Sequence, residues 1–171
     1  TLMDIRPFEN DDLEKVIALW DVCGLSVNPL NDPAKDISLC LESGHGTVLV
    51  GELDGNLVAT VMVGHDGHRG WYYYLATSPN HQRQGLGRQI VAAAEEWLTA
   101  RNLPKVEILV RDINMVAMAF YEKLGYVQEP VQVLSRRLDG REHVEVKKSV
   151  ESTVTYLQMT QAPTRSPLPS P

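Results

Sequence analysis

Two runs of β-branched residues on either side of a tight-turn sequence constrain the fold of this chain more than any other feature. The runs cover Thr47–Leu53 and Leu57–Gly64, and Asp54-Gly55-Asn56 lies between them. Asp-Gly readily adopts the positive φ angles that a two-residue hairpin turn requires. An aromatic-rich strand is predicted next, over Trp71–Thr77. The pattern therefore predicts three successive antiparallel strands.

Helical patterns lie on both sides of these strands. Between Asn10, which can cap a helix, and Gly24, apolar residues recur at the i, i+3, i+4 and i+7 spacing of an amphipathic helix. Asp32-Pro33 is typical of the start of a second helix, and Ser43-Gly44 of its end. After the strands, a long amphipathic helix is predicted from Gly87 to about Ala100.

The remaining elements indicate the fold class. Strands are predicted over Leu2–Pro7 and Val106–Val110, and the second is followed by a helix over Met115–Leu124 that Gly125 can end. Strand, loop, helix and strand form a right-handed crossover unit. A last pair of strands is predicted within residues 126–138. The chain is therefore predicted to be α/β, with a mixed, mostly antiparallel central sheet and helices on both faces.

Length and composition predict one folded domain and a tail. The chain has 171 residues, 43% of them hydrophobic, which suits a single core over residues 1–140. Residues 141–171 are predicted to be a C-terminal extension. Within it, Val150–Tyr156 alternates like an edge strand that could exchange between protomers, so a homodimer is one expectation. Ala162–Pro171 is rich in Pro and Ser and is typical of a tail.

The charge distribution narrows the class of partner. A net charge of −6 argues against nucleic acid. Residues 1–66 hold 12 acidic and 3 basic residues, whereas residues 67–171 hold 10 acidic and 13 basic ones. The basic half suits a polyanionic cofactor, and the acidic half suits a cationic acceptor. No apolar run approaches the roughly 18 residues of a membrane helix, and Thr1–Arg6 lacks the features of a signal peptide, so a cytoplasmic protein without membrane partners is expected.

Metal and disulfide sites are not expected. Cys23 and Cys40 lie in helix-like segments without CxxC spacing and are predicted to be reduced core thiols. His65, Asp66 and His68 gather around a predicted turn, but their spacing matches no established ligand pattern.

The most informative loop is Gln82-Arg83-Gln84-Gly85-Leu86-Gly87-Arg88, between a strand and a long helix. Glycines at 85 and 87 allow a bulky anion to approach the backbone amides, and the helix dipole and two arginines favour a pyrophosphate there. A Walker A loop would need Lys at position 88, and a dinucleotide fingerprint would need Gly or Ala at position 90, where the chain has Ile90. Both alternatives are therefore disfavoured.

This loop resembles the Q/R-x-x-G-x-G/A signature of the GNAT (Gcn5-related N-acetyltransferase) family. The family's second half-motif, N-x-x-A-x-x-x-Y-x-x-x-G-F/Y, is similar to Asn114–Tyr126. The resemblance covers Leu2–Leu138 in element order. Asn31-Asp32-Pro33 and the turn at residues 66–70 look like the YpeA-type bacterial branch. The resemblance implies the GNAT fold and acetyl-coenzyme A as co-substrate.

The resemblance also implies roles for individual residues. Tyr121 would protonate the departing coenzyme A thiolate, which suits a phenol with a pKa of about 10. Backbone groups of Leu75, Ala76 and Thr77 would bind the acetyl carbonyl and the pantetheine amides at a bulge. Asn114, Ala117 and Tyr121 lie on one helix face, along which the cofactor arm could run. Asn114 is equally expected to be a simple N-cap. Val116, Phe120 and Leu124 form a separate apolar row predicted to pack on the sheet.

The position of the general base departs from the family pattern. Many relatives carry a glutamate at the position that Leu109 occupies in this chain. Glu107 lies two residues earlier on the same predicted strand face and is the first candidate. Asp66 and His68 are weaker candidates, since both residues are ordinary in turns, and a proton relay through solvent is an alternative.

These features predict an N-acetyltransferase that moves an acetyl group from acetyl-coenzyme A to a primary amine by direct attack in a ternary complex. The acceptor would be a small molecule or a protein N-terminus or lysine. The alternative is a non-catalytic acyl-coenzyme A binding module, which the absence of Glu at position 109 would favour.

Overall fold

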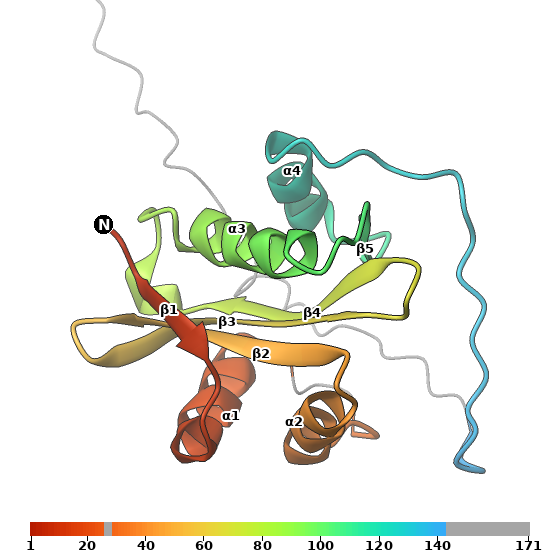
Figure 1. Cartoon of the computed structure of the whole chain (residues 1–171), viewed down its shortest axis with the longest axis horizontal. Helices are drawn as coiled ribbons and strands as arrows, with labels where there is room; N and C mark the ends of the chain where they lie inside the picture. Colours follow the sequence, from red (N-terminus) through yellow and green to blue (C-terminus); the bar gives the residue numbers. More distant parts are fainter. Residues whose placement is uncertain (26–28, 143–171) are drawn as a thin grey trace, which may run out of the picture.

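The computed structural model describes residues 1–25 and 29–142. Five strands form one sheet in the order β1-β2-β3-β4-β5, in which the first four are antiparallel and β5 runs parallel to β4. The predicted mixed sheet is therefore confirmed (Figure 1). The strands are β1 (Asp4–Pro7), β2 (Gly46–Leu53), β3 (Asn56–His65), β4 (Gly70–Thr77) and β5 (Val106–Ile108).

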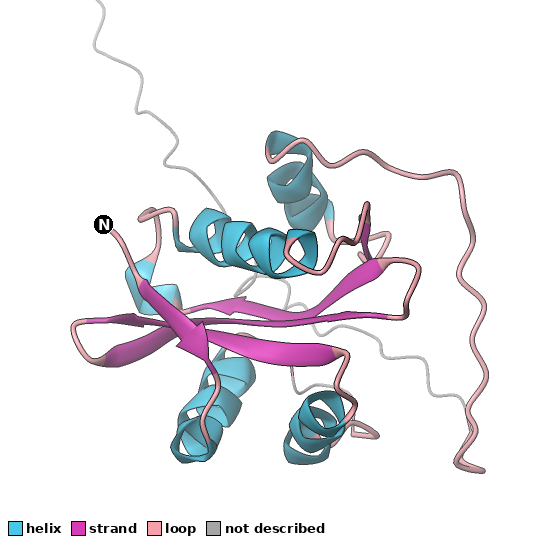
Figure 2. Ribbon diagram, in the orientation of Figure 1, coloured by secondary structure: helices cyan, strands magenta, loops and turns pink. Residues whose placement is uncertain are grey.

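Helices cover both faces of the sheet, as Figure 2 shows. One face carries α1 and α2, and the other carries α3 and α4 (Figure 1). Each face has its own apolar core. Val48 and Val50 of β2 lie in the core beneath α1 and α2, and the valines of β3 lie in the core beneath α3 and α4. The helices are α1 (Leu13–Val22), α2 (Pro33–Glu42), α3 (Leu86–Thr99) and α4 (Met115–Lys123), with short 3₁₀ turns η1 (Asn10–Asp12) and η2 (Pro79–His81).

Local sequence signals set most element ends. The β2–β3 turn places Asp54 and Gly55 at φ 50° and 77°, as the hairpin sequence predicts. The Asp32 side chain caps α2 by accepting a hydrogen bond from the Lys35 amide at 3.1 Å. Gly125 follows α4 at φ 91°, in the left-handed conformation expected after a helix.

The start of the first helical segment differs from the prediction, because Asn10 is not its cap. Asn10 lies within η1, and the Glu9 amide instead donates to the Asp12 carboxylate at 2.8 Å. Asp12 is buried and accepts two hydrogen bonds from the Arg6 guanidinium, at 2.7 and 2.8 Å. Arg6 also bonds Glu52 on β2 at 2.7 Å. This bonding to Arg6 lowers the pKa of Asp12 and ties η1 to the sheet.

The predicted strands within residues 126–138 are wrong. After α4 the chain is extended but forms no strand, and it is held at Glu129, by Lys105 at 2.6 Å, and at Arg141, by the Leu30 carbonyl at 3.3 Å. β-propensity reflects the fit of a side chain to a half-buried surface, and the apolar side chains of residues 127–138 are exposed. They are Val127, Val131, Val133, Leu134 and Leu138.

Two further predictions concern the ends of the chain. The strand predicted over Val150–Tyr156 and the Pro-rich tail lie outside the described residues. Among the residues that are described, no helix is long and apolar enough to span a bilayer.

Candidate active site

A β-bulge interrupts β4 where the resemblance places the acetyl group. Thr60 of β3 is opposite Ala76, and Met62 is opposite Tyr73, so two residues of β4 face the single residue between them on β3. One of the two is Tyr74, whose φ of 52° is unusual for a residue with a side chain.

The bulge lies just beyond the point where β4 and β5 part. Pairing between these strands ends at Tyr72 and Ile108. From Tyr73 onward, the edge of β4 that faces β5 has no strand partner within the described part of the chain. The predicted binding residues Leu75, Ala76 and Thr77 therefore lie on an open strand edge, where main-chain groups can bind amides of a ligand.

The glycine loop follows the short turn η2 after β4 and leads into α3. Gly85 is the N-cap of α3 and has φ 72°. Arg83 also has a positive φ, of 64°. Left-handed residues alternating with others direct successive N–H groups into one concavity, which favours an anion. Arg83, Gln84, Gly85 and Arg88 are exposed, whereas Gln82 is half-buried.

Two residues of the loop serve α3 itself. The Leu86 side chain is buried in the core, so only its backbone can contact a cofactor. A Cβ atom on Gly87 would lie 3.1 Å from the ring of Phe120 on α4. From the sequence, a glycine here is expected to allow the anion to approach. The structure gives another reason, because α3 and α4 could not pack this closely with a larger residue.

Helix α4 turns Ala117 and Tyr121 to its buried side, and Asn114 precedes the helix as its N-cap. The Asn114 side chain accepts a hydrogen bond from the Ala117 amide at 3.1 Å and so caps the helix. Ala117 and Tyr121 are buried, at 3% and 8% exposure. The row formed by Val116, Phe120 and Leu124 is only half-buried. Phe120 and Leu124 of this row nevertheless pack against the same core, into which α4 inserts Ala117 and Tyr121 more deeply.

Sequence reasoning missed a group of tyrosines beside Tyr121. The Tyr126 ring lies 5.3 Å from that of Tyr121. Its hydroxyl donates to Glu95 at 2.8 Å and lies 3.2 Å from the Tyr72 hydroxyl. Burial raises the pKa of Tyr72 to about 12 and also raises that of Tyr126. The last position of the second motif marks Tyr126, but only the fold brings Tyr72 to it.

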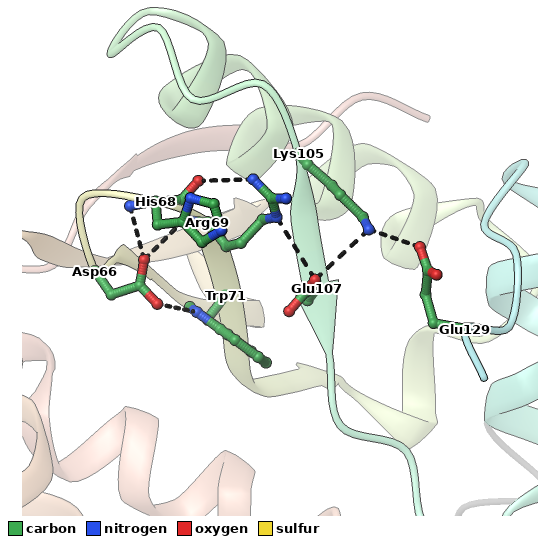
Figure 3. Close-up of polar contacts among 7 residues, drawn as sticks. All are labelled: Asp66, His68, Arg69, Trp71, Lys105, Glu107 and Glu129. Atoms are coloured by element: carbon green, nitrogen blue, oxygen red, sulfur yellow. Dashed lines mark hydrogen bonds and ion pairs between the residues drawn. The ribbon is translucent and has the colours of Figure 1, made fainter. Parts of the chain in front are cut away.

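Glu107 does not reach the bulge. It is paired with Trp71 across β4 and β5, three residues before Tyr74, or roughly 10 Å along a strand. Figure 3 shows its carboxylate between two cations, with Arg69 Nε at 3.7 Å and Lys105 Nζ at 3.6 Å. The carboxylate is therefore engaged by two cations that directly precede β4 and β5, before the bulge.

Of the alternative bases in the turn, Asp66 is also engaged, and His68 contributes its backbone amide to the same turn. The Asp66 carboxylate accepts hydrogen bonds from the amides of Arg69 and His68 and from Trp71 Nε1, at 2.7, 2.8 and 3.0 Å (Figure 3). These bonds, that of Arg69 first, lower the pKa of Asp66 to about 2. At the position of the expected glutamate, Leu109 is 53% exposed. No group of three potential metal ligands is found within residues 1–25 and 29–142.

Neither cysteine is poised for nucleophilic chemistry. Burial raises the pKa of Cys23 to about 12, and its thiol donates to the Thr77 carbonyl at 3.4 Å. Burial also raises the pKa of Cys40. Both thiols are free, as predicted, and remain protonated near neutral pH.

Comparison with known proteins decides the family. The model of the acetyltransferase (GNAT) family matches residues 13–126, which include both motifs and the bulge. This chain belongs to the GNAT family. An acetyltransferase of Yersinia pestis (strain Pestoides F) is 41% identical over 136 residues, covering 80% of this chain and 96% of the relative. An acetyltransferase of Pectobacterium atrosepticum is 40% identical over 142 residues, covering 82% and 100%.

Solved structures agree on the GNAT fold. The aminoglycoside acetyltransferase AAC(6')-Iy, in complex with a coenzyme A bisubstrate analogue, matches with a TM-score of 0.69 at 17% identity, covering 80% of this chain and 99% of that one. AAC(6')-IG from Acinetobacter haemolyticus matches with a TM-score of 0.65 at 18% identity, covering 80% and 100%. This GNAT protein is an acyl-coenzyme A dependent N-acetyltransferase with acetyl-coenzyme A as co-substrate. Its place in the YpeA-type branch stays a prediction.

Proposed function

We propose that the protein transfers the acetyl group of acetyl-coenzyme A directly to a primary amine, with both substrates bound together at the bulge of β4. The open edge of β4 at residues 75–77, which only the turn η2 separates from the glycine loop, carries the proposal. Amides of this edge would bind the thioester carbonyl and the pantetheine arm. The loop amides at residues 82–88, with Arg83 and Arg88, would bind the pyrophosphate.

In the proposed reaction, the neutral amine nitrogen attacks the thioester carbonyl carbon. The oxyanion that forms is stabilised by main-chain N–H groups of the bulge, and its collapse breaks the carbon–sulfur bond. The Tyr121 hydroxyl donates its proton to the departing thiolate, the attacking nitrogen loses a proton to water, and Tyr121 regains one from water. The raised thiol pKa values of Cys23 and Cys40 support direct attack, because neither offers a thiolate for an acetyl-enzyme intermediate.

The proton of the incoming ammonium is proposed to leave through water. Glu107 and Asp66 both hold cations or amides and lie before the bulge, which supports solvent as the acceptor. An acceptor bound as a cation suits the acidic first 66 residues. The aminoglycoside acetyltransferases among the solved relatives support a small polyamine, and a protein N-terminus or lysine is the second candidate.

A homodimer is proposed on the exposed side of β5. Within the described residues, β5 pairs with β4 alone, and the nearby segment 127–138 exposes five apolar side chains. Such an edge and such a patch favour association with a second copy. The molar mass from light scattering tests this, and a monomer at high concentration would contradict it.

The activity is tested by initial rates over a panel of amines, with free thiol as the readout. Intersecting rate plots for the two substrates are expected, since a ternary complex forms before transfer. The Tyr121→Phe variant should lower kcat with little change in acetyl-coenzyme A affinity, and an unaltered kcat would remove Tyr121 from the mechanism. Tight cofactor binding without turnover on any amine would favour the non-catalytic binding module instead.

A further inference from the structure

A buried threonine bonds the bulge from the opposite strand. Thr60 has no exposed surface and lies opposite Ala76, next to Tyr74 and Leu75, the two residues of the bulge. Its hydroxyl donates a hydrogen bond to the Tyr74 carbonyl at 3.0 Å and accepts one from Trp20 Nε1 at 2.8 Å. A hydroxyl has one proton to donate, so both bonds are satisfied together.

Tyr74 is held at three points. Its carbonyl accepts from Thr60, its ring stacks on that of Trp20 with centroids 3.9 Å apart and an interplanar angle of 11°, and its hydroxyl donates to Asp36 of α2 at 2.6 Å. Trp20 is fully buried in the core beneath α1 and α2. Both α1 and α2 therefore contribute contacts to this single residue of β4.

This concentration of contacts has a physical reason. A bulge disrupts the ladder, so a carbonyl within it needs another donor. A tyrosine at φ 52° is strained, and such a conformation persists only when several surrounding contacts hold it in place. The Thr60 hydroxyl supplies the donor at the strained residue itself.

We infer that Thr60 is a positioning residue for acetyl transfer, because its hydroxyl holds the main chain of the β4 bulge where the thioester carbonyl is received. This inference rests on the proposed function. Thr60 touches neither substrate, and it acts through the Tyr74 carbonyl. The glycine loop lies outside this network, so binding of the pyrophosphate does not depend on it.

The test replaces Thr60 by Val, which keeps the branched shape and removes the hydroxyl. We expect kcat to fall about 10- to 100-fold, as misplacement of a reacting centre by about 1 Å does. The dissociation constant of coenzyme A itself should stay within about threefold of the wild-type value, since its pyrophosphate binds elsewhere. Thr60→Ser, which restores the hydroxyl, should recover most of kcat.

Val48→Ala is the matched control. Val48 is also fully buried in the core beneath α1 and α2, but it takes no part in the hydrogen bonds to Tyr74. Its truncation should lower stability while kcat per folded molecule stays within about twofold. If Thr60→Val does not fold, Trp20→Phe keeps an aromatic ring and removes the hydrogen bond to Thr60, and a smaller fall in kcat is expected.

A readout without turnover separates this inference from the proposed function. Amide hydrogen exchange at residues 74–77 should be faster in Thr60→Val than in the wild type and in Val48→Ala. Unchanged exchange would overturn the inference, whether or not the wild type acetylates an amine. It would also be overturned if kcat stayed within twofold, or if the Ser variant were as defective as the Val variant. A wild type without turnover would defeat the proposed function and the role of Thr60 in acetyl transfer, while the exchange measurement would still test whether Thr60 holds the bulge.

Discussion

Replacing Gly85 by Ala isolates the backbone conformation of the glycine loop. Gly85 caps α3 at φ 72° and ψ 21°, and a Cβ atom there would meet no atom within 4 Å. The substitution therefore adds no clash, and its cost is the left-handed conformation alone, about 1–2 kcal/mol for a residue with a Cβ atom. Gly85 is exposed, so the free loop can relax out of that conformation.

The bound loop cannot relax if its amides converge on the pyrophosphate. The strain then opposes binding, and because about 1.4 kcal/mol changes Kd tenfold, the Kd of acetyl-coenzyme A should rise about 5- to 30-fold. Isothermal titration calorimetry measures this directly. Gly85→Asn should lose less affinity, since asparagine tolerates the left-handed region better than alanine.

Gly55→Ala is the control for this prediction. Gly55 lies in the β2–β3 turn at φ 77°, and a Cβ atom there would also meet nothing within 4 Å. Gly55→Ala should lower the unfolding free energy, measured by urea denaturation, by up to the same cost of about 1–2 kcal/mol. The Kd of acetyl-coenzyme A should not change. If acetyl-coenzyme A binds Gly85→Ala and Gly55→Ala with Kd values within twofold of each other, the loop conformation does not form the pyrophosphate site.

Three further predictions concern stability and the sequence-predicted base. Asp12→Asn removes the charged acceptor of Arg6 and should lower the unfolding free energy by about 2 kcal/mol at pH 7. Because the folded pKa of Asp12 is lowered, this contribution is complete above the unfolded pKa and disappears as the pH falls below about 4. Urea denaturation of both proteins from pH 7 to 3 should show the difference in unfolding free energy shrink. A constant difference would contradict the prediction. Gly70→Ala places a Cβ atom 2.4 Å from Leu98 Cδ1 and should lower the unfolding free energy by about 1–3 kcal/mol. The double variant with Leu98→Ala should recover part of this loss. An unchanged Tm for Gly70→Ala would show that α3 shifts freely. Glu107→Gln should leave kcat within about threefold, because this carboxylate pairs with cations away from the bulge. A large fall in kcat that is recovered at high pH would instead identify Glu107 as the base.

Local chemistry in the sequence determined much of the fold. The β2–β3 turn depends on two adjacent residues that tolerate positive φ, and the cap of α2 depends on Asp32 and an amide three residues on. The glycine loop and the Asn114 cap are likewise complete within a few residues. Interactions of this range join residues that are close in the sequence. The observed helices and strands were therefore predicted at nearly their observed places.

Only the tertiary structure decided the details of the site. The bulge at Tyr74 depends on Thr60, 14 residues away, and Thr60 in turn bonds Trp20, 40 residues from it. The cations that surround Glu107, and the face that α4 buries, also follow from how separate elements pack. These contacts join residues that no local pattern relates, because the register of β4 and the placement of the helices are set by the whole core at once.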